Sequence, residues 1–178
     1  DLSSGITWAT DHGENVINMS LQFYPAFGLT AMLRALLQDS VNYAHDAGVV
    51  VVAAAGNSNL GGIGVVAYPA ASDNTLAVSA TNACDQFATQ ASSGFVSNFG
   101  PQVDVAAPGD DLYSATNAGG YKCLSGTSMA TPVVSGIAAL VKSYVPELTN
   151  TSIENVIKSS VLDLGAAGWD DHYGFGRV

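Results

Sequence analysis

Apolar positions follow two different periods along this chain, and their alternation predicts buried strands joined by helices. Residues 15–21 and 49–55 are short runs that are apolar on both faces, which is typical of central parallel strands covered by helices. Between them, residues 28–47 carry apolar side chains at helical spacing, and Gly48 follows as a stop signal. A strand, a helix of about five turns and a second strand form a right-handed crossover, so we expect the two strands to be parallel.

Residues 130–145 form the most apolar of the predicted helices, because Lys142 is their only charged residue. Such a helix is expected to be buried. Thr127 or Ser128 suits the N-cap, and Pro132 then falls near the first turn, where its missing N–H does little harm. Ser128 would therefore lie where unpaired backbone N–H groups and the positive end of the helix dipole stabilise a developing oxyanion. Taken alone, an isolated Ser-x-Ala after glycine would favour a plain capping serine.

The remaining segments extend the same alternation. Residues 1–12 are typical of the end of a helix that leads into a strand, residues 75–81 of a third strand, and residues 104–107 of a small strand within a turn-rich segment. Thr151 and Glu154 form a capping box that opens a surface helix. The apolar residues that we expect to point inward from this helix are Ile153, Val156, Ile157 and Val161.

Charge and the length of the apolar runs exclude two classes of partner. Five Lys+Arg against 15 Asp+Glu give a formal net charge of −10, whereas binding to a phosphate backbone needs a basic stripe. The longest apolar stretch, residues 48–56, is far shorter than the roughly 20 residues of a membrane span. We therefore expect neither nucleic acid nor a membrane as partner. Cys84 and Cys123 could form one disulfide, remain thiols or pair with cysteines outside this sequence.

Six short motifs follow one another along the chain. They are Val-Ile-Asn-Met-Ser-Leu at 16–21, Ala-Ala-Ala-Gly-Asn at 53–57, Tyr-Pro-Ala at 68–70, Asp-Val-Ala-Ala-Pro-Gly at 104–109, Gly-Thr-Ser-Met-Ala-Thr-Pro at 126–132 and Tyr-Gly-Phe-Gly-Arg-Val at 173–178. In this order the set resembles the subtilisin-like serine proteases, or subtilases, over nearly the whole chain. The resemblance implies a doubly wound α/β fold with a mainly parallel sheet whose N-terminal strands are missing. It also implies that residues 1–178 are a single partial catalytic domain, truncated at both ends.

The resemblance implies a serine endopeptidase that works through an acyl-enzyme, with a protein or peptide as substrate. Ser128 is the expected nucleophile, and the Asn57 side-chain amide together with the Ser128 backbone N–H is the expected oxyanion hole. In similar proteases the segment Ser20, Leu21, Gln22 lies alongside the substrate as an added strand. The expected walls of the pocket for the side chain before the cut are Ala54, Ala55, Gly56 and Ala67. Because these walls are small, we expect a preference for Phe, Leu, Met or Tyr.

The general base is the missing part of this reading. The family uses Asp, His and Ser in that chain order, and the sequence has only three histidines. His12 and His45 precede strands, and seven residues at about 3.3 Å each place them roughly 20 Å from the carboxyl edge. We therefore expect the aspartate and histidine of the triad upstream of Asp1, and this chain alone to be inactive.

Two alternatives remain open from the sequence. Ser128, Asp163 or Asp170, and His172 follow the chain order of an α/β-hydrolase, although the motif Gly-Thr-Ser-Met-Ala differs from the G-x-S-x-G elbow. Residues 129–171, which lie between Ser128 and His172, also include no predicted strand that could carry the aspartate of such a triad. The second alternative is a degenerate protease that acts as a non-catalytic binding module, for which the retained Ser128 and Asn57 would have no physical need.

One departure from the family pattern affects the expected substrate groove. The family continues Ser-Leu with two glycines, whereas this chain has Gln22 and Phe23, and side chains there are expected to narrow the groove.

The resemblance further implies a secreted protein, and we expect a monomer. It requires no cofactor but allows a structural calcium ion, for which the backbone carbonyls of residues 70–75 are a candidate site. Asn150 begins an Asn-Thr-Ser glycosylation acceptor pattern.

Overall fold

The computed structural model describes residues 1–24, 31–58 and 65–178, and its centre is a four-stranded parallel sheet. The strands are β1 (Val16–Met19), β2 (Val50–Ala54), β3 (Leu76–Thr81) and β4 (Val105–Pro108), in the spatial order β1-β2-β3-β4. All three pairings are parallel, for example Val16 with Val50 and Val78 with Val105. The prediction of buried parallel strands is therefore confirmed, and the fold class is α/β.

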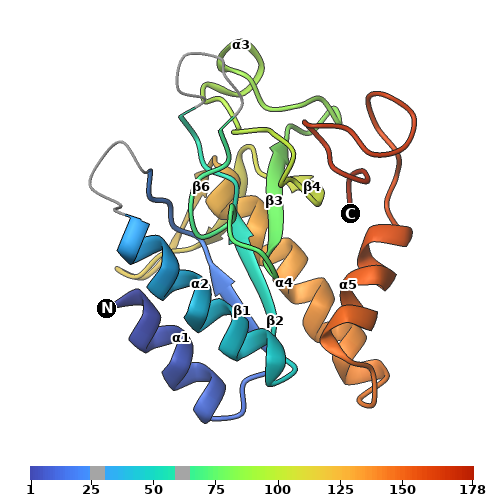
Figure 1. Cartoon of the computed structure of the whole chain (residues 1–178). Helices are drawn as coiled ribbons and strands as arrows, with labels where there is room; N and C mark the ends of the chain where they lie inside the picture. The colour runs from blue at the N-terminus through green and yellow to red at the C-terminus, as the bar shows by residue number, and fades with distance from the viewer. Residues whose placement is uncertain (25–30, 59–64) are drawn as a thin grey trace.

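Helices cover both faces of this sheet. Figure 1 shows α1 (Leu2–Asp11) and α2 (Ala31–Asp46) on one side, with α4 (Thr127–Tyr144) and α5 (Asn150–Ser159) on the other. Strand β2 separates two apolar cores because its side chains alternate between the faces. Val51 packs in the core with α1 and α2, whereas Val52 packs in the core with α4 and α5. Every residue of β2 is buried, which explains why it reads as a continuous apolar run.

The predicted helices 28–47 and 1–12 are confirmed where the structure describes them. Helix α2 begins at Ala31 among the described residues, and the predicted positions 28–30 lie outside them. Helix α1 is capped by Asp1, whose carboxylate accepts from the Ser4 N–H.

A hairpin that the sequence pattern did not predict precedes α4. Its strands are β5 (Leu112–Ala115) and β6 (Tyr121–Leu124), which pair antiparallel. The residues of both strands are largely exposed, so they show no apolar alternation that could have revealed them. The turn-rich region also holds the short helix α3 (Gln90–Ser93).

The start of α4 corrects the prediction. Gly126, with φ +149°, is the N-cap and supplies no side-chain hydrogen bond, so neither Thr127 nor Ser128 has the capping role. A Cβ at position 126 would lie 3.3 Å from Asn57 Oδ1, which together with the positive φ explains the glycine.

Pro132 therefore lies inside α4, in its second turn rather than near its first. Proline has no N–H, so the carbonyl of Ser128, four residues earlier, lacks its helical donor. The Ser20 hydroxyl donates to that carbonyl at 2.8 Å. A side chain from the segment after β1 thus replaces the hydrogen bond that proline removes.

Helix α5 also begins differently from the prediction. Its N-cap is Thr149, whose hydroxyl accepts from the Ser152 N–H, so the predicted capping box at Thr151 is wrong. Ile153 and Ile157 are buried as predicted. Val161 packs partly buried against the same core, whereas Val156 is 39% exposed.

The candidate glycosylation site is not accessible. Asn150 is buried, and its side-chain amide donates to the carbonyls of His45 and Val49, at 2.8 and 3.3 Å. A glycan on this nitrogen would break both contacts, so Asn150 has a structural role between α5 and the start of β2.

Cys84 and Cys123 are both exposed free cysteines, so they do not form a disulfide with each other. Across residues 1–24, 31–58 and 65–178, none of the helices has the length and apolar character needed to cross a bilayer.

The Ser20 contact yields a double-mutant test of stability. Ser20→Ala should lower the free energy of unfolding by about 1 kcal/mol, because the Ser128 carbonyl loses its donor. In a Pro132→Ala background the restored N–H can reach that carbonyl, so the same substitution should cost less than half as much. Urea unfolding of the intact protein measures all four variants. Equal losses in the two backgrounds would show that the hydroxyl does not replace the helical bond.

Candidate active site

Ser128 is the second residue of α4, at the end of the helix where backbone N–H groups lack helical partners. Its side chain is half-buried, and its hydroxyl donates to the backbone carbonyl of Ser20 at 3.3 Å. Its backbone N–H donates to none of the described residues. The nucleophile candidate and the first residue of the candidate substrate segment are therefore in direct contact, as the sequence predicts from parallel strands whose carboxyl ends meet at one edge.

Asn57 follows β2 and is oriented by Thr127. Its Oδ1 accepts from the Thr127 backbone N–H at 2.7 Å and from the Thr127 hydroxyl at 3.0 Å. Only the amide oxygen can accept from an N–H, so these two contacts fix which way the amide faces. The Asn57 Nδ2 consequently points away from Thr127, and it donates to nothing within the part of the chain that the structure describes. Asn57 Nδ2 and the Ser128 N–H are therefore two donors that have no acceptor among the described residues.

Thr127 also fixes the residue before Asn57. Its hydroxyl accepts from the Gly56 N–H at 3.1 Å, and its own carbonyl accepts from the Thr131 hydroxyl at 2.7 Å. Thr127 is completely buried. The residue next to the candidate nucleophile therefore links the end of β2 to the start of α4.

Gln22 and Asn98 complete this region from two other segments. The Gln22 Oε1 accepts from the Asn57 backbone N–H at 2.9 Å. Asn98 is fully buried, donates from its backbone to the Gly56 carbonyl at 2.7 Å, and accepts at Oδ1 from the Ser58 N–H at 3.0 Å. Asn98 was not predicted, because it lies in an irregular segment that gives no periodic signal, and only the tertiary structure brings it to the end of β2.

The predicted pocket walls are present but are not open to solvent. Ala54, Ala55 and Ala67 are each at most 1% exposed, Gly56 is buried, and the Ala67 N–H donates to the Ala55 carbonyl at 2.8 Å. A cavity of about 690 Å³ lies elsewhere, between α1, α2 and the segment after β1. Its lining residues are Asp1, Leu2, Ser3, Ser4, Gln22, Phe23, Tyr24, Leu33, Leu36 and Leu37. Leu21, the other residue predicted to contact substrate, packs partly buried against the core beneath α1 and α2.

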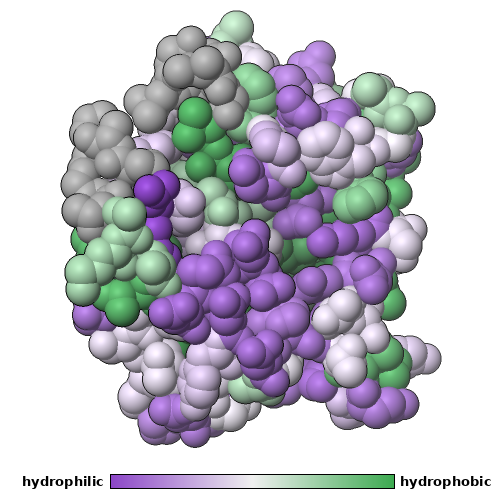
Figure 2. Space-filling view, viewed as in Figure 1, coloured by the Kyte–Doolittle hydropathy of each residue, from purple (hydrophilic) through white to green (hydrophobic). Residues whose placement is uncertain are grey.

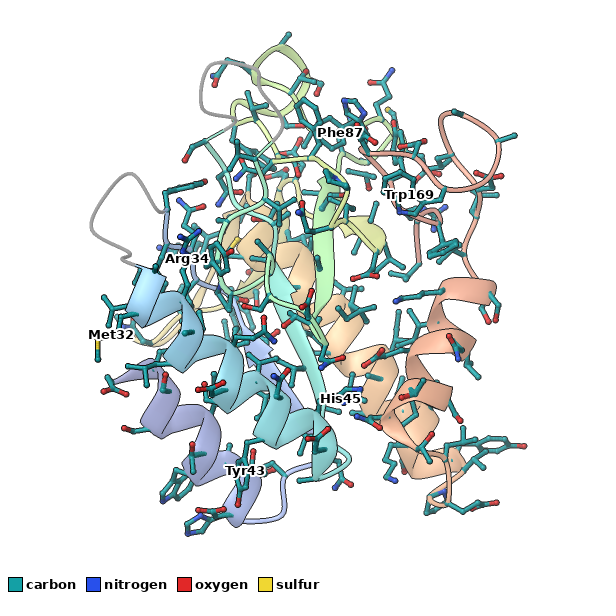
Figure 3. All side chains as sticks on the ribbon, in the orientation of Figure 1. Met32, Arg34, Tyr43, His45, Phe87 and Trp169 are labelled. Carbon is teal, nitrogen blue, oxygen red and sulfur yellow. The ribbon has the colours of Figure 1, made fainter. Side chains whose placement is uncertain are left out.

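Two of the histidines lie at the far edge of the sheet. His12 ends α1, before β1, and its ring stacks on Trp8 at 3.9 Å. His45 lies in the last turn of α2, before β2, and Figure 3 shows it at the end of the molecule opposite Phe87 and Trp169. Both positions agree with the expectation that neither imidazole reaches Ser128.

His172 does not form the alternative triad with Ser128. Its ring stacks on Phe99 and meets Phe87 edge-on, with ring centroids 4.5 Å apart in both cases. Asp170 accepts from the His172 backbone N–H rather than from the ring. Asp163 accepts from the backbone N–H of Gly168. Among the described residues, no hydrogen bond joins this ring to Ser128, and both carboxylates instead stabilise their own loop.

The carboxyls with shifted pKa values belong to another part of the molecule. Burial raises the pKa of Asp104 even though Lys158 Nζ lies 2.7 Å from its carboxylate and opposes the shift. Burial likewise raises the pKa of Glu154 on α5. Asp104 precedes β4, at the edge of the sheet opposite Ser128, so we assign this cluster to packing between α5 and the sheet.

The chain resembles known proteins along its whole length. Residues 1–176 match the model described as "Subtilase family". Subtilisin Savinase of Lederbergia lenta is 40% identical over 99% of this chain and 59% of that protein. The halolysin-like extracellular serine protease Nep of Natrialba magadii is 40% identical over the whole chain and 30% of that protein.

A solved structure agrees with the sequence relatives. A crystal structure of a lanthipeptide protease matches with a TM-score of 0.82 and 25% identity, over 99% of this chain and 62% of that one. The chain thus spans 30% to 59% of the length of the two relatives named above. With the family model matched from residue 1 to 176 and 40% identity to subtilisins, the chain belongs to the subtilase family.

Proposed function

We propose that the protein containing this chain is a serine endopeptidase and that Ser128 is its nucleophile. The observation that carries the proposal is the contact between Asn57 Oδ1 and Thr127, at 2.7 and 3.0 Å. It orients the carboxamide so that Nδ2, like the Ser128 N–H, can donate to an acceptor beside the Ser128 hydroxyl. Two convergent donors next to a hydroxyl nucleophile are the requirement for stabilising a tetrahedral oxyanion.

The chemistry follows from this arrangement. The Ser128 Oγ attacks the carbonyl carbon of the substrate peptide bond. The carbonyl oxygen becomes negatively charged and accepts hydrogen bonds from Asn57 Nδ2 and the Ser128 N–H. The positive end of α4 stabilises the same charge. Collapse of this intermediate breaks the C–N bond. The nitrogen receives the proton that left Ser128 and departs as the amine, and the ester that remains on Ser128 is hydrolysed by water to a carboxylic acid and the free hydroxyl.

The proton of Ser128 needs an acceptor that the described residues do not place beside it. In the resting arrangement this hydroxyl donates to the Ser20 carbonyl, which is too weak a base to take the proton. We assign general-base catalysis to a histidine, oriented by an aspartate, from a segment of the protein outside residues 1–178. On this proposal the chain by itself is inactive.

The substrate would pair with the segment after β1. Ser20, Leu21 and Gln22 offer backbone groups to an extended peptide, which suits a protease that accepts many sequences. Polar residues gather over the centre of the face seen in Figure 2. We propose a monomeric secreted enzyme that acts on proteins or peptides and binds neither nucleic acid nor a membrane.

A structural calcium ion near residues 70–75 also remains a proposal. In this loop the hydroxyls of Ser72 and Thr75 are buried without a hydrogen-bond partner in the described chain. Oxygen ligands of this kind suit calcium, whose role would be to stabilise the loop before β3 and not to take part in the reaction.

The role of Asn57 is tested by two substitutions in the intact protein. Asn57→Ala should lower kcat by about 10²–10³-fold with little change in KM, a magnitude that comes from subtilisin itself. Asn57→Asp keeps an oxygen that accepts from Thr127 but lacks the Nδ2 donor, so it should lose activity while the fold is retained. Steady-state kinetics and thermal melting measure the two effects. An Asn57→Asp enzyme as active as wild type would refute the role of the amide.

The role of Ser128 is tested by covalent labelling. A fluorophosphonate probe should modify Ser128 in the intact protein, since an activated serine forms a stable phosphonate ester with it. Peptide mass mapping locates the adduct, and Ser128→Ala is the control that should remain unmodified. Absence of any adduct at Ser128 would favour the non-catalytic binding module.

A further inference from the structure

On the proposed function, the substrate side chain before the scissile bond would enter a slot between two segments. One is the candidate substrate strand, residues 20–22, and the other is the end of β2, residues 54–56. A hydrogen bond spans the two, from the Asn57 N–H to the Gln22 side chain. We propose that Gln22 closes this slot and makes the enzyme select a small residue, Gly, Ala or Ser, before the cut. The inference rests on the proposed protease function and names the substrate class of the same site.

The contacts around Gly56 show how full the slot is. A Cβ at Gly56 would lie 3.0 Å from Gln22 Oε1 and 2.8 Å from the Tyr24 hydroxyl. Ordinary contacts of a Cβ begin at about 3.4 Å, so these two polar atoms lie directly against the glycine wall. Asn98 Nδ2 is closer still, so the side chains of Asn98, Tyr24 and Gln22 together occupy the space beside Gly56 that a large substrate side chain would need.

The deeper part of the slot is held by a buried polar network. The Tyr24 hydroxyl donates to Ser58 Oγ at 3.0 Å and accepts from Asn98 Nδ2 at 2.8 Å. Asn98 Nδ2 also donates to the Ala55 carbonyl at 3.0 Å. Tyr24 and Asn98 are both buried, so displacing either would leave buried polar groups without partners. A phenyl ring cannot enter by pushing this network aside.

Gln22 is the movable part of the closure. It is exposed, and within the described part of the chain its carboxamide accepts from the Asn57 N–H at 2.9 Å and has a longer contact of 3.4 Å from the Tyr24 hydroxyl. A large side chain would have to break this bond, and it would release the backbone of the residue that supplies the oxyanion donor. A small side chain leaves the bond intact. The bond alone corresponds to a factor of about ten in kcat/KM.

This inference replaces the sequence-based preference for Phe, Leu, Met or Tyr. That expectation used only the small walls Ala54, Ala55, Gly56 and Ala67. It did not take account of Gln22, whose side chain the sequence already predicts to narrow the groove and whose contact with Gly56 the structure shows.

The test uses peptide anilides that differ only in the residue before the scissile bond, which is Ala, Leu or Phe. The intact wild-type protein should cleave the Ala substrate with a kcat/KM at least about tenfold above that for Phe. Gln22→Gly should shift this ratio toward Phe by at least about tenfold. Gln22→Glu is the matched control, because its carboxylate still accepts from the Asn57 N–H, and it should keep Ala above Phe.

The outcomes separate this inference from the proposed function. If fluorophosphonate labels Ser128 but wild type prefers Phe, or if Gln22→Gly leaves the ratio unchanged, the role of Gln22 is wrong and the protease assignment stands. If Ser128 is not labelled and no anilide is cleaved, both are overturned. Thermal melting verifies that Gln22→Gly is folded, and Gln22→Ala, which also removes the carboxamide, gives the same reading should the glycine variant unfold.

Discussion

The N-terminus of α4 must find its hydrogen-bond partners outside the helix, and the site depends on this requirement. Gly126 has no side chain to cap it, and a larger residue there would press on Asn57. Asn57 Oδ1 meets the requirement by accepting from the Thr127 N–H. This contact satisfies one N–H of the helix end, joins the helix to the end of β2, and leaves the amide nitrogen of Asn57 facing away from Thr127.

Parallel pairing makes this contact possible. β1 and β2 run in the same direction, so the segments that follow them emerge at one edge of the sheet, beside the start of α4. Ser20 then replaces the hydrogen bond that Pro132 removes from α4, and Gln22 takes the backbone N–H of Asn57. The segment after β1 is thus tied to the helix end by Ser20 and to the segment after β2 by Gln22.

Under the inferred preference for small residues, the buried polar side chains beside Gly56 limit the size of the substrate side chain that the site accepts. The buried Asn98 bonds to the backbone on either side of Asn57 and to Tyr24. Because every one of these groups is satisfied within the network, the network is costly to open. Gln22, exposed and held mainly by one bond, is the position at which specificity can change with least disturbance to the fold.

The sequence by itself determined the alternation of buried strands and helices, because burial on both faces or on one stripe leaves a periodic record. It also determined Ser128 and Asn57 as candidates, through the order of the motifs. It misplaced the caps of α4 and α5, since several hydroxyl residues stand near each helix start and only the packed backbone selects one. The hydrogen-bond partners of Ser20, Gln22 and Asn98 were decided by the tertiary structure alone. Their partners are 35 to 108 residues away in the chain, and contacts at such separation leave no local pattern.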